Sequence, residues 1–216
     1  MTMTQTAQRM QKPIIGIVGG IGAGKSFVAG LFGELGACVI NADDLVHRVY
    51  ERDDVRQQLK KWWGDAVVTP SGVDRKAVAK IVFSEAEQLR RLEALVHPLV
   101  AVERDVQMRQ FASDSNVTAF VWDTPLLIEA GHHTQCDVLV FCDAPLSVRL
   151  ARVAARGWDE QELSRRESMQ LAIDKKRALC HVTITTDAPA TAVRLMVARV
   201  FQDVLAGVYN KPLGRT

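Results

Sequence analysis

The chain has 216 residues, long enough for one α/β domain with insertions and for a substantial hydrophobic core. Hydrophobic residues make up 48%, charged residues 24% and the formal net charge is +2, which argues against disorder and against a strong overall field that would recruit nucleic acid or a membrane. No apolar run approaches the roughly 20 residues that span a bilayer.

The first eleven residues are polar and lack the apolar stretch of a secretion signal, so we expect 1–11 to form a flexible extension. The cysteines contain no Cys-x-x-Cys pair and lie in or beside apolar runs: Cys38, Cys136, Cys142 and Cys180. This pattern predicts reduced, structural thiols in a cytoplasmic protein.

Five short runs, mostly apolar on both faces, predict the buried strands of a parallel sheet: Ile14–Val18, Ala37–Ile40, Val117–Trp122, Val138–Cys142 and Val182–Thr185. Helical segments lie between them, the first from Lys25 to about Leu35. The predicted class is therefore α/β, with a five-stranded parallel sheet flanked by helices.

The long connection between the second and third strands reads as helical, over 55–63, 75–83 and 85–111. Ser84-x-x-Glu87 resembles a capping box, and Pro98 should end or kink a helix. A connection this long must carry structure of its own, so we predict an inserted helical lobe at about 44–114.

A second insertion, at about 150–180, is rich in Arg and Lys, and its helical pattern breaks at Gly157 and Asp159. We predict a helical lid here. A final amphipathic helix follows, with its stripe at Val193, Val197, Val200, Phe201 and Val204. The core would comprise about 12–43, 115–149 and 181–208, so that 12–216 forms one domain.

A phosphate-binding pattern follows the first strand and opens the first helix: Gly19-Gly20-Ile21-Gly22-Ala23-Gly24-Lys25-Ser26 matches G-x-x-x-x-G-K-[ST]. Small residues let the backbone direct its N–H groups at phosphate oxygens, and the helix N-terminus adds positive potential. Lys25 would bridge the β- and γ-phosphates and Ser26 would help to hold Mg²⁺. The motif predicts a nucleotide site of the P-loop kind.

Asp43 follows the second strand, whose carboxyl end should lie beside this loop. Its carboxylate could orient a substrate hydroxyl in line with the γ-phosphorus and accept its proton late in the transfer. Alternatively, Asn41 or Asp43 caps the following helix.

Three charged residues could act on the transferring phosphoryl group. Arg152 and Arg156 are four positions apart, so on one helix face they could neutralise its charge, or they could form a solvated basic surface. Asp123, after the third strand, could hold Mg²⁺ through water or simply end that strand. The chain lacks the Asn-Lys-x-Asp signal of GTPases and is too short for a motor ATPase, which leaves a small-molecule kinase.

Taken in order, these motifs resemble those of the dephospho-coenzyme A kinase family from about Ile14 to Thr186. The phosphate loop and His47 match the family pattern, and Asn41-Ala42-Asp43 falls on its Asp-Ala-Asp. Four later groups also match: Gly72-Val73-Asp74-Arg75, His97-Pro98, Asp123-x-Pro125-Leu126-Leu127-x-Glu129 and the lid residues Arg149, Arg152, Arg156 and Gln170. The chain departs from that pattern at Val18, Asn41, Phe27, Cys180-His181 and Thr186.

The resemblance implies a P-loop kinase that uses ATP and Mg²⁺ to phosphorylate the ribose 3′-hydroxyl of dephospho-CoA, the last step of CoA synthesis. It implies catalytic roles for Asp43, Lys25 and Arg152. ATP would contact Gly20, Ile21, Gly22, Ala23, Gly24, Lys25, Ser26, Phe27, Arg152 and Arg156. Dephospho-CoA would contact Asp43, His47, Arg75, His97, Pro125, Leu126 and Glu129, and Mg²⁺ would contact Ser26 and Asp123.

Two alternatives remain from the sequence: a kinase for another nucleoside or nucleotide, and a regulator that binds nucleotide without transferring phosphate. A lone histidine such as His97 is also commonly satisfied by a backbone carbonyl. We expect no nucleic-acid, membrane or obligate protein partner.

Overall fold

A computed structural model describes residues 12–209; the predicted extension at 1–11 lies outside this range. Two compact units divide the chain: the described residues up to Val39 together with those from Phe111 onward, and Ile40–Gln110. The boundary after Val39 falls within the second strand. Each unit has its own hydrophobic core.

The first unit is built on a five-stranded sheet with the order β2-β5-β1-β6-β7. Its strands are β1 (Ile14–Gly19), β2 (Ala37–Asn41), β5 (Ala119–Asp123), β6 (Val138–Asp143) and β7 (Val182–Thr185). Strand β1 pairs in parallel with β5 and β6, and β6 pairs in parallel with β7. All five predicted strands are confirmed, with ends that differ by at most two residues.

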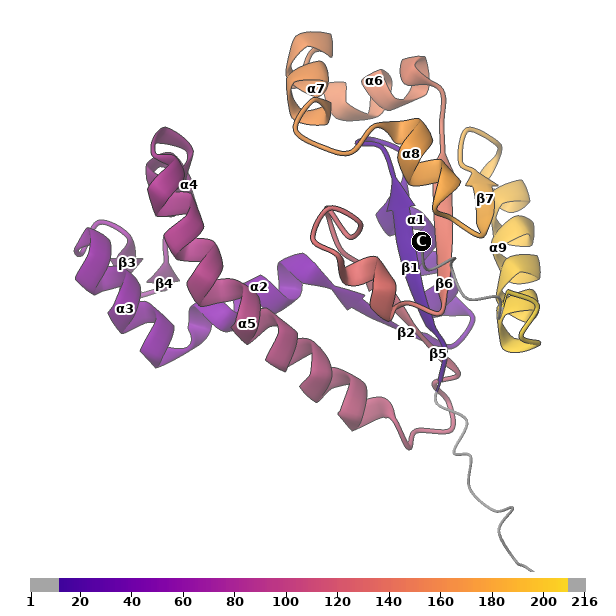
Figure 1. Ribbon diagram of the computed structural model, residues 1–216, viewed down its shortest axis with the longest axis horizontal. Helices are drawn as coiled ribbons and strands as arrows, with labels where there is room; N and C mark the ends of the chain where they lie inside the picture. The colour runs from indigo at the N-terminus through magenta and orange to yellow at the C-terminus, as the bar shows by residue number, and fades with distance from the viewer. Residues whose placement is uncertain (1–11, 210–216) are drawn as a thin grey trace, which may run out of the picture. The chain divides into compact units, whose positions relative to one another are not determined.

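Helices α1 (Lys25–Glu34) and α9 (Ala190–Leu205) pack against each other and share one core with the sheet (Figure 1). The predicted stripe of α9 is confirmed, because all five of its residues are buried in this core. Phe32 of α1 meets Phe201 of α9 edge to face at 5.7 Å between ring centroids. The phosphate-binding loop is thereby carried on rigid, fully packed elements.

The segment predicted as a lid, about 150–180, contains the second half of α6 (Leu146–Ala154), all of α7 (Glu160–Glu167) and all of α8 (Ile173–Ala178). The break between α6 and α7 is confirmed, and Asp159 caps α7 by accepting the Glu162 N–H at 2.8 Å. The expectation that Arg152 and Arg156 share a helix face is wrong, because α6 ends at Ala154 and Arg156 lies in the turn before Gly157. The left-handed backbone of Gly157, with φ 76°, turns the chain out of the helix.

The second unit is helical except for a two-stranded antiparallel hairpin, β3 (Val68–Thr69) and β4 (Gly72–Val73), which the sequence analysis did not predict. Its helices are α2 (Ala42–Glu51), α3 (Asp53–Trp63), α4 (Arg75–Ser84) and α5 (Ala86–Phe111). Their apolar sides form a core that includes Val49, Leu59 and Val96. The predicted helices are confirmed as elements.

Ser84 and Pro98 behave differently from the predicted helix signals. Ser84 does not cap α5, because its hydroxyl donates to the Ile81 carbonyl oxygen at 2.8 Å and it ends α4 instead. Of the two outcomes predicted for Pro98, the helix does not end there, since α5 continues through it to Phe111, and a kink stays a prediction. A proline removes one backbone hydrogen bond, and the buried Leu92 and Val96 of α5 supply packing that holds the helix through that defect.

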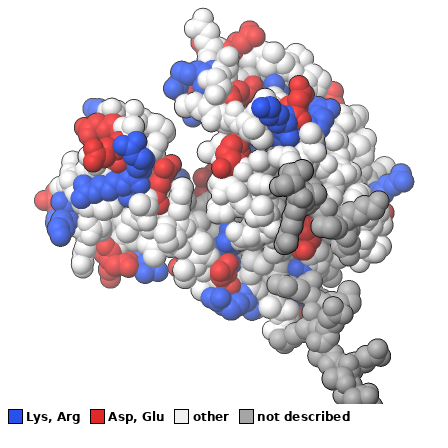
Figure 2. All heavy atoms as spheres, in the orientation of Figure 1, with Lys and Arg blue, Asp and Glu red and all other residues white. Residues whose placement is uncertain are grey.

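The described surface carries mixed charge. On the face that Figure 2 shows, Lys and Arg side chains are interspersed with Asp and Glu. Within residues 12–209, no helix combines the length and the apolar character that crossing a membrane requires.

Candidate active site

The phosphate-binding loop joins the end of β1 to the start of α1. Gly22 and Gly24 have φ values of 76° and 83°, in the left-handed region that favours glycine. A Cβ at Gly22 would also lie 2.8 Å from the Arg149 carbonyl oxygen. Over this described stretch, α1 has neither a side-chain cap nor an acidic residue in its first turn, so its first N–H groups are left for an anionic ligand.

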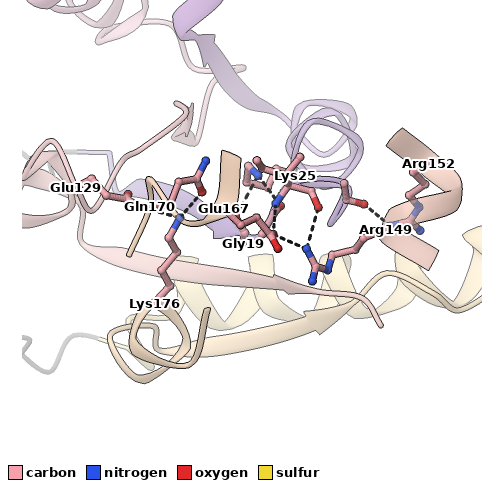
Figure 3. A network of polar contacts seen from close by, with 11 residues as sticks. Gly19, Lys25, Glu129, Arg149, Arg152, Glu167, Gln170 and Lys176 are labelled. Atoms are coloured by element: carbon pink, nitrogen blue, oxygen red, sulfur yellow. Dashed lines mark hydrogen bonds and ion pairs between the residues drawn. The ribbon is translucent and has the colours of Figure 1, made fainter. Parts of the chain in front are cut away.

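Lys25, the first residue of α1, points back along the loop (Figure 3). Its Nζ donates to the carbonyl oxygens of Gly20 at 2.9 Å and Gly19 at 3.1 Å. Burial lowers the pKa of the Lys25 ammonium from its usual value, and the Asp123 carboxylate at the end of β5 opposes that shift. The ammonium is therefore held at the mouth of the loop by bonds that a phosphate oxygen can replace.

Arg152 of α6 connects the loop to the end of β7. Its Nη1 donates to the Gly22 carbonyl oxygen at 3.1 Å and to Thr186 Oγ1 at 3.0 Å, and its Nη2 donates to the Thr186 carbonyl oxygen at 2.6 Å. The buried Thr186 hydroxyl in turn donates to the Ala23 carbonyl oxygen at 2.8 Å. Thr186, noted above only as a departure from the family pattern, thus positions both the loop and Arg152.

Glu167 and Arg149 form a second connection to the loop, which the sequence analysis missed. Glu167 Oε1, from α7, accepts the Ile21 backbone N–H at 3.3 Å and is paired with Arg149 Nη1. The same Arg149 nitrogen donates to the Ile21 carbonyl oxygen at 3.3 Å. The sequence offered no signal for this contact, because Glu167 is 146 positions from Ile21 and lies in a run of charged residues.

Glu129, predicted to bind substrate, lies in the segment that follows β5. Its side chain holds α8 in place. Its Oε1 pairs with Lys176 Nζ at 2.7 Å and accepts the Leu171 N–H at 2.9 Å. Lys176 also donates to Gln170 Oε1 at 2.8 Å, so the buried ammonium is satisfied from two sides (Figure 3). A role for Glu129 at the substrate remains a prediction.

A cavity of about 370 Å³ opens beside the loop in the first unit. It is lined by residues of the loop, of the β6 end and of the lid, among them Gly20, Phe141, Asp143, Arg149 and Arg177. Arg177 donates to Asp143 Oδ1 at 2.7 Å and lies over the Phe141 ring at 5.0 Å from its centroid. The cavity combines an apolar wall with charged groups, as expected for a nucleotide site.

The residues predicted at the acceptor belong mainly to the second unit. Asn41 caps α2, its side-chain oxygen accepting the N–H groups of Asp43 at 2.8 Å and Asp44 at 3.4 Å. The capping interpretation is thus confirmed for Asn41, while the Asp43 side chain is exposed in the first turn of α2. One turn further along α2, His47 Nε2 lies 3.5 Å from the Glu51 carboxylate.

Arg75 and His97, also predicted at the acceptor, are both exposed. Arg75 is the first residue of α4, next to its cap Asp74. His97 lies inside α5 rather than at a helix end. Their roles toward dephospho-CoA stay predictions.

The remaining predicted site residues belong to the first unit. Ser26 and Phe27 are exposed in the first turn of α1, and Asp123 is buried at the end of β5. Pro125 and Leu126 follow β5, Leu126 with a left-handed φ of 57°. Arg156 is exposed, and its charge contributes to the lowered pKa of Lys25.

A glycine-rich loop that leads from a central parallel strand into an uncapped helix, with a lysine at its mouth and arginines from helix α6, defines a P-loop kinase of small molecules. The sequence model of one such family, dephospho-CoA kinase, matches residues 13–191. The chain belongs to the dephospho-CoA kinase family.

Individual relatives agree with this assignment. The dephospho-CoA kinase of Aquifex aeolicus is 33% identical over 192 residues, which cover 88% of this chain and 96% of that relative. A solved structure from Thermus thermophilus superposes with a TM-score of 0.74 at 33% identity and covers 92% of this chain and 98% of its own. The dephospho-CoA kinase from Campylobacter jejuni, at 22% identity, shares the fold with a TM-score of 0.68 and covers 90% of this chain and 98% of its own.

Proposed function

We propose that the protein transfers the γ-phosphoryl group of ATP to the ribose 3′-hydroxyl of dephospho-CoA, giving CoA and ADP in the last step of CoA synthesis. The observation that carries the proposal is the family match over residues 13–191, which includes the phosphate-binding loop and the lid. The loop supplies backbone N–H groups for the triphosphate of ATP, and Lys25 would leave the carbonyl oxygens of Gly19 and Gly20 to meet the β- and γ-phosphates.

Asp43 would serve the acceptor. Its exposed carboxylate, fixed in the first turn of α2 by the Asn41 cap, would accept a hydrogen bond from the 3′-hydroxyl and later its proton. Arg75, His47 and His97 would contact dephospho-CoA around it. Arg152 and Arg156 would neutralise charge on the equatorial oxygens of the transferring phosphoryl group.

Ser26 and Asp123 would hold Mg²⁺. A hydroxyl and a carboxylate are both hard oxygen donors, and Mg²⁺ commonly takes one or two protein ligands and completes its shell with water and substrate phosphates. The described residues contain no cluster of three His, Cys, Asp or Glu side chains that could hold a metal, which agrees with a site of so few protein ligands. When bound, Mg²⁺ neutralises charge on the phosphate oxygens.

We further propose a cytoplasmic location and a small-molecule substrate, with no nucleic-acid partner and no obligate protein partner. The thiols of the cysteines support the location. The net charge of +2 and the interspersed charges of the visible face support a local rather than a global anion site (Figure 2).

The test is a direct product assay. Purified protein is incubated with ATP, Mg²⁺ and dephospho-CoA, and CoA and ADP are measured by mass spectrometry against parallel reactions with AMP, CMP and adenosine. We expect equal amounts of CoA and ADP and no product from the other acceptors. Turnover of a nucleoside monophosphate alone, or ATP binding without any transfer, would replace the proposal by another kinase or by a nucleotide-binding regulator.

A further inference from the structure

The Glu167 carboxylate lies at the mouth of the phosphate-binding loop. It accepts the Ile21 N–H at 3.3 Å, and its side chain is 22% exposed. A Cβ added at Gly20 would lie 3.2 Å from its Oε1, so the carboxylate sits close against the loop backbone (Figure 3).

The Ile21 N–H lies in the loop whose backbone N–H groups bind phosphate oxygens in sites of this kind. A backbone N–H makes one strong hydrogen bond. A carboxylate and a phosphate also repel each other at such short range. The Glu167 carboxylate and a nucleotide phosphate therefore cannot use the Ile21 N–H together.

Arg149 is the cation of this contact. Its side chain is 9% exposed, and its Nη1 is shared between Glu167 and the Ile21 carbonyl oxygen. Arg149 also lines the cavity beside the loop. When Glu167 leaves, the guanidinium would keep its place against the loop and need another anion.

We propose that Glu167 stands in for a nucleotide phosphate when the site is free, and that the phosphate displaces it from both the Ile21 N–H and Arg149. Arg149 is then an additional phosphate-binding residue, which exchanges a carboxylate for a phosphate oxygen. The Glu167 contact keeps the lid helix α7 on the empty loop and lowers the apparent affinity for nucleotide, because only the released state binds. This inference rests on the proposed function in taking ATP as the donor.

The test measures binding rather than turnover. Titration calorimetry on the full chain compares the native protein with Glu167→Gln, using tripolyphosphate and adenosine as separate probes. Removing the charge should tighten tripolyphosphate binding about five- to tenfold, equivalent to roughly 1–1.4 kcal/mol. Adenosine binding should stay within about twofold, because the base and ribose do not compete with the carboxylate.

Glu160→Gln is the matched control, since Glu160 is an exposed glutamate at the start of the same helix and the change in net charge is identical. It should leave both dissociation constants within about twofold. Glu167→Asp keeps the charge but shortens the side chain by one methylene, so it should also tighten tripolyphosphate binding, by about threefold or more. Thermal melts of each variant confirm that the proteins compared are folded.

The inference is overturned if Glu167→Gln changes the tripolyphosphate dissociation constant by less than about twofold or weakens binding, or if Glu160→Gln tightens it equally. Its failure is separable from that of the proposed function. Normal CoA formation by Glu167→Gln with unchanged tripolyphosphate binding would contradict the proposed displacement of Glu167 and leave the proposed function intact. Tighter tripolyphosphate binding by Glu167→Gln, in a protein that makes no CoA, would contradict the proposed substrate alone.

Discussion

The Lys176 ammonium and the Glu129 carboxylate form an ion pair of 2.7 Å, in which the side chains are 5% and 20% exposed. The pair joins the segment after β5 to helix α8, and the Leu171 N–H donates to the same Glu129 oxygen at 2.9 Å. Because the ammonium is almost fully buried, its packing there requires the opposite charge of Glu129, and the Gln170 amide oxygen supplies a further hydrogen bond.

Breaking this pair from one side should be costly. Glu129→Gln leaves the Lys176 ammonium buried without an opposite charge, and we expect a loss of about 2–3 kcal/mol in the free energy of unfolding measured with urea. The double variant with Lys176→Met should recover at least half of that loss. If the effects of the two single substitutions on the free energy of unfolding simply add in the double variant, the interaction between Glu129 and Lys176 contributes nothing to stability.

The same pair has a pH signature. Partial burial raises the pKa of Glu129, but the hydrogen bonds from Lys176 and from backbone N–H groups, together with the Lys176 charge, outweigh it, so the pKa lies below the ordinary value of 4.5. A lowered folded-state pKa contributes stability above the ordinary value, and that stability is lost as the pH falls through the folded-state value. Urea unfolding between pH 7 and pH 3 should show a smaller acid-induced loss in Glu129→Gln than in the native protein.

Substitutions at Asp43 and at its neighbours can distinguish a catalytic role from a helix-capping role. Asp43→Asn should lower kcat by at least about 10²-fold, because the carboxylate is proposed to act on the reacting hydroxyl. Asp44→Asn, one residue further in the same helical turn, should keep kcat within a few-fold. Asn41→Ala removes the cap and should cost about 1 kcal/mol of stability. Near-normal turnover by Asp43→Asn would remove it from the reaction.

Arg75 is expected to act on the acceptor alone. Arg75→Ala should raise the KM for dephospho-CoA more than the KM for ATP, measured by steady-state CoA formation. Lys76→Ala is the control, since Lys76 is the next residue of α4 and is also an exposed cation. A larger effect on the ATP KM would place Arg75 away from the acceptor.

Lys25 should limit the alkaline range of the enzyme. Burial lowers the pKa of Lys25 from the usual 10.5. The value of kcat/KM for ATP should therefore begin to fall at a lower pH than it would if Lys25 had the pKa of an ordinary lysine. Lys25→Ala should lower kcat by at least about 10²-fold, because the ammonium is proposed to stabilise developing charge on the phosphates. A flat profile up to pH 10.5 would contradict the first expectation, and a small effect of the substitution would contradict the second.

The thiols of Cys142 and Cys180 should be inert. Burial raises the pKa of each to about 12, so both stay protonated at pH 9. Peptide mapping after brief alkylation at pH 9 should show both unmodified in the folded protein and fully modified in denaturant. Rapid alkylation of either one in the folded protein would show that its surroundings are open to water.

Much of the fold could be predicted from patterns among residues that are close together in the sequence. Strand runs such as Ile14–Val18, the loop from Gly19 to Ser26 and the α9 stripe each depend on residues that are neighbours along the chain or a few positions apart. Periodicity and glycine spacing record such local requirements directly. Local signals failed where packing competed with them, as at Pro98, which lies inside α5, and at Ser84, which bonds backward to Ile81.

Only the tertiary structure decided the partners of the charged groups. Nothing along the chain indicates that Glu167 reaches Ile21 across 146 positions, that Arg152 reaches Thr186 or that Lys176 is buried against Glu129. A charged side chain has the same sequence pattern whether it faces water or a distant partner. The fold decides whether a charged side chain faces water or a partner. A buried charge must be neutralised, and the arrangement of strands and helices determines which opposite charge is within reach.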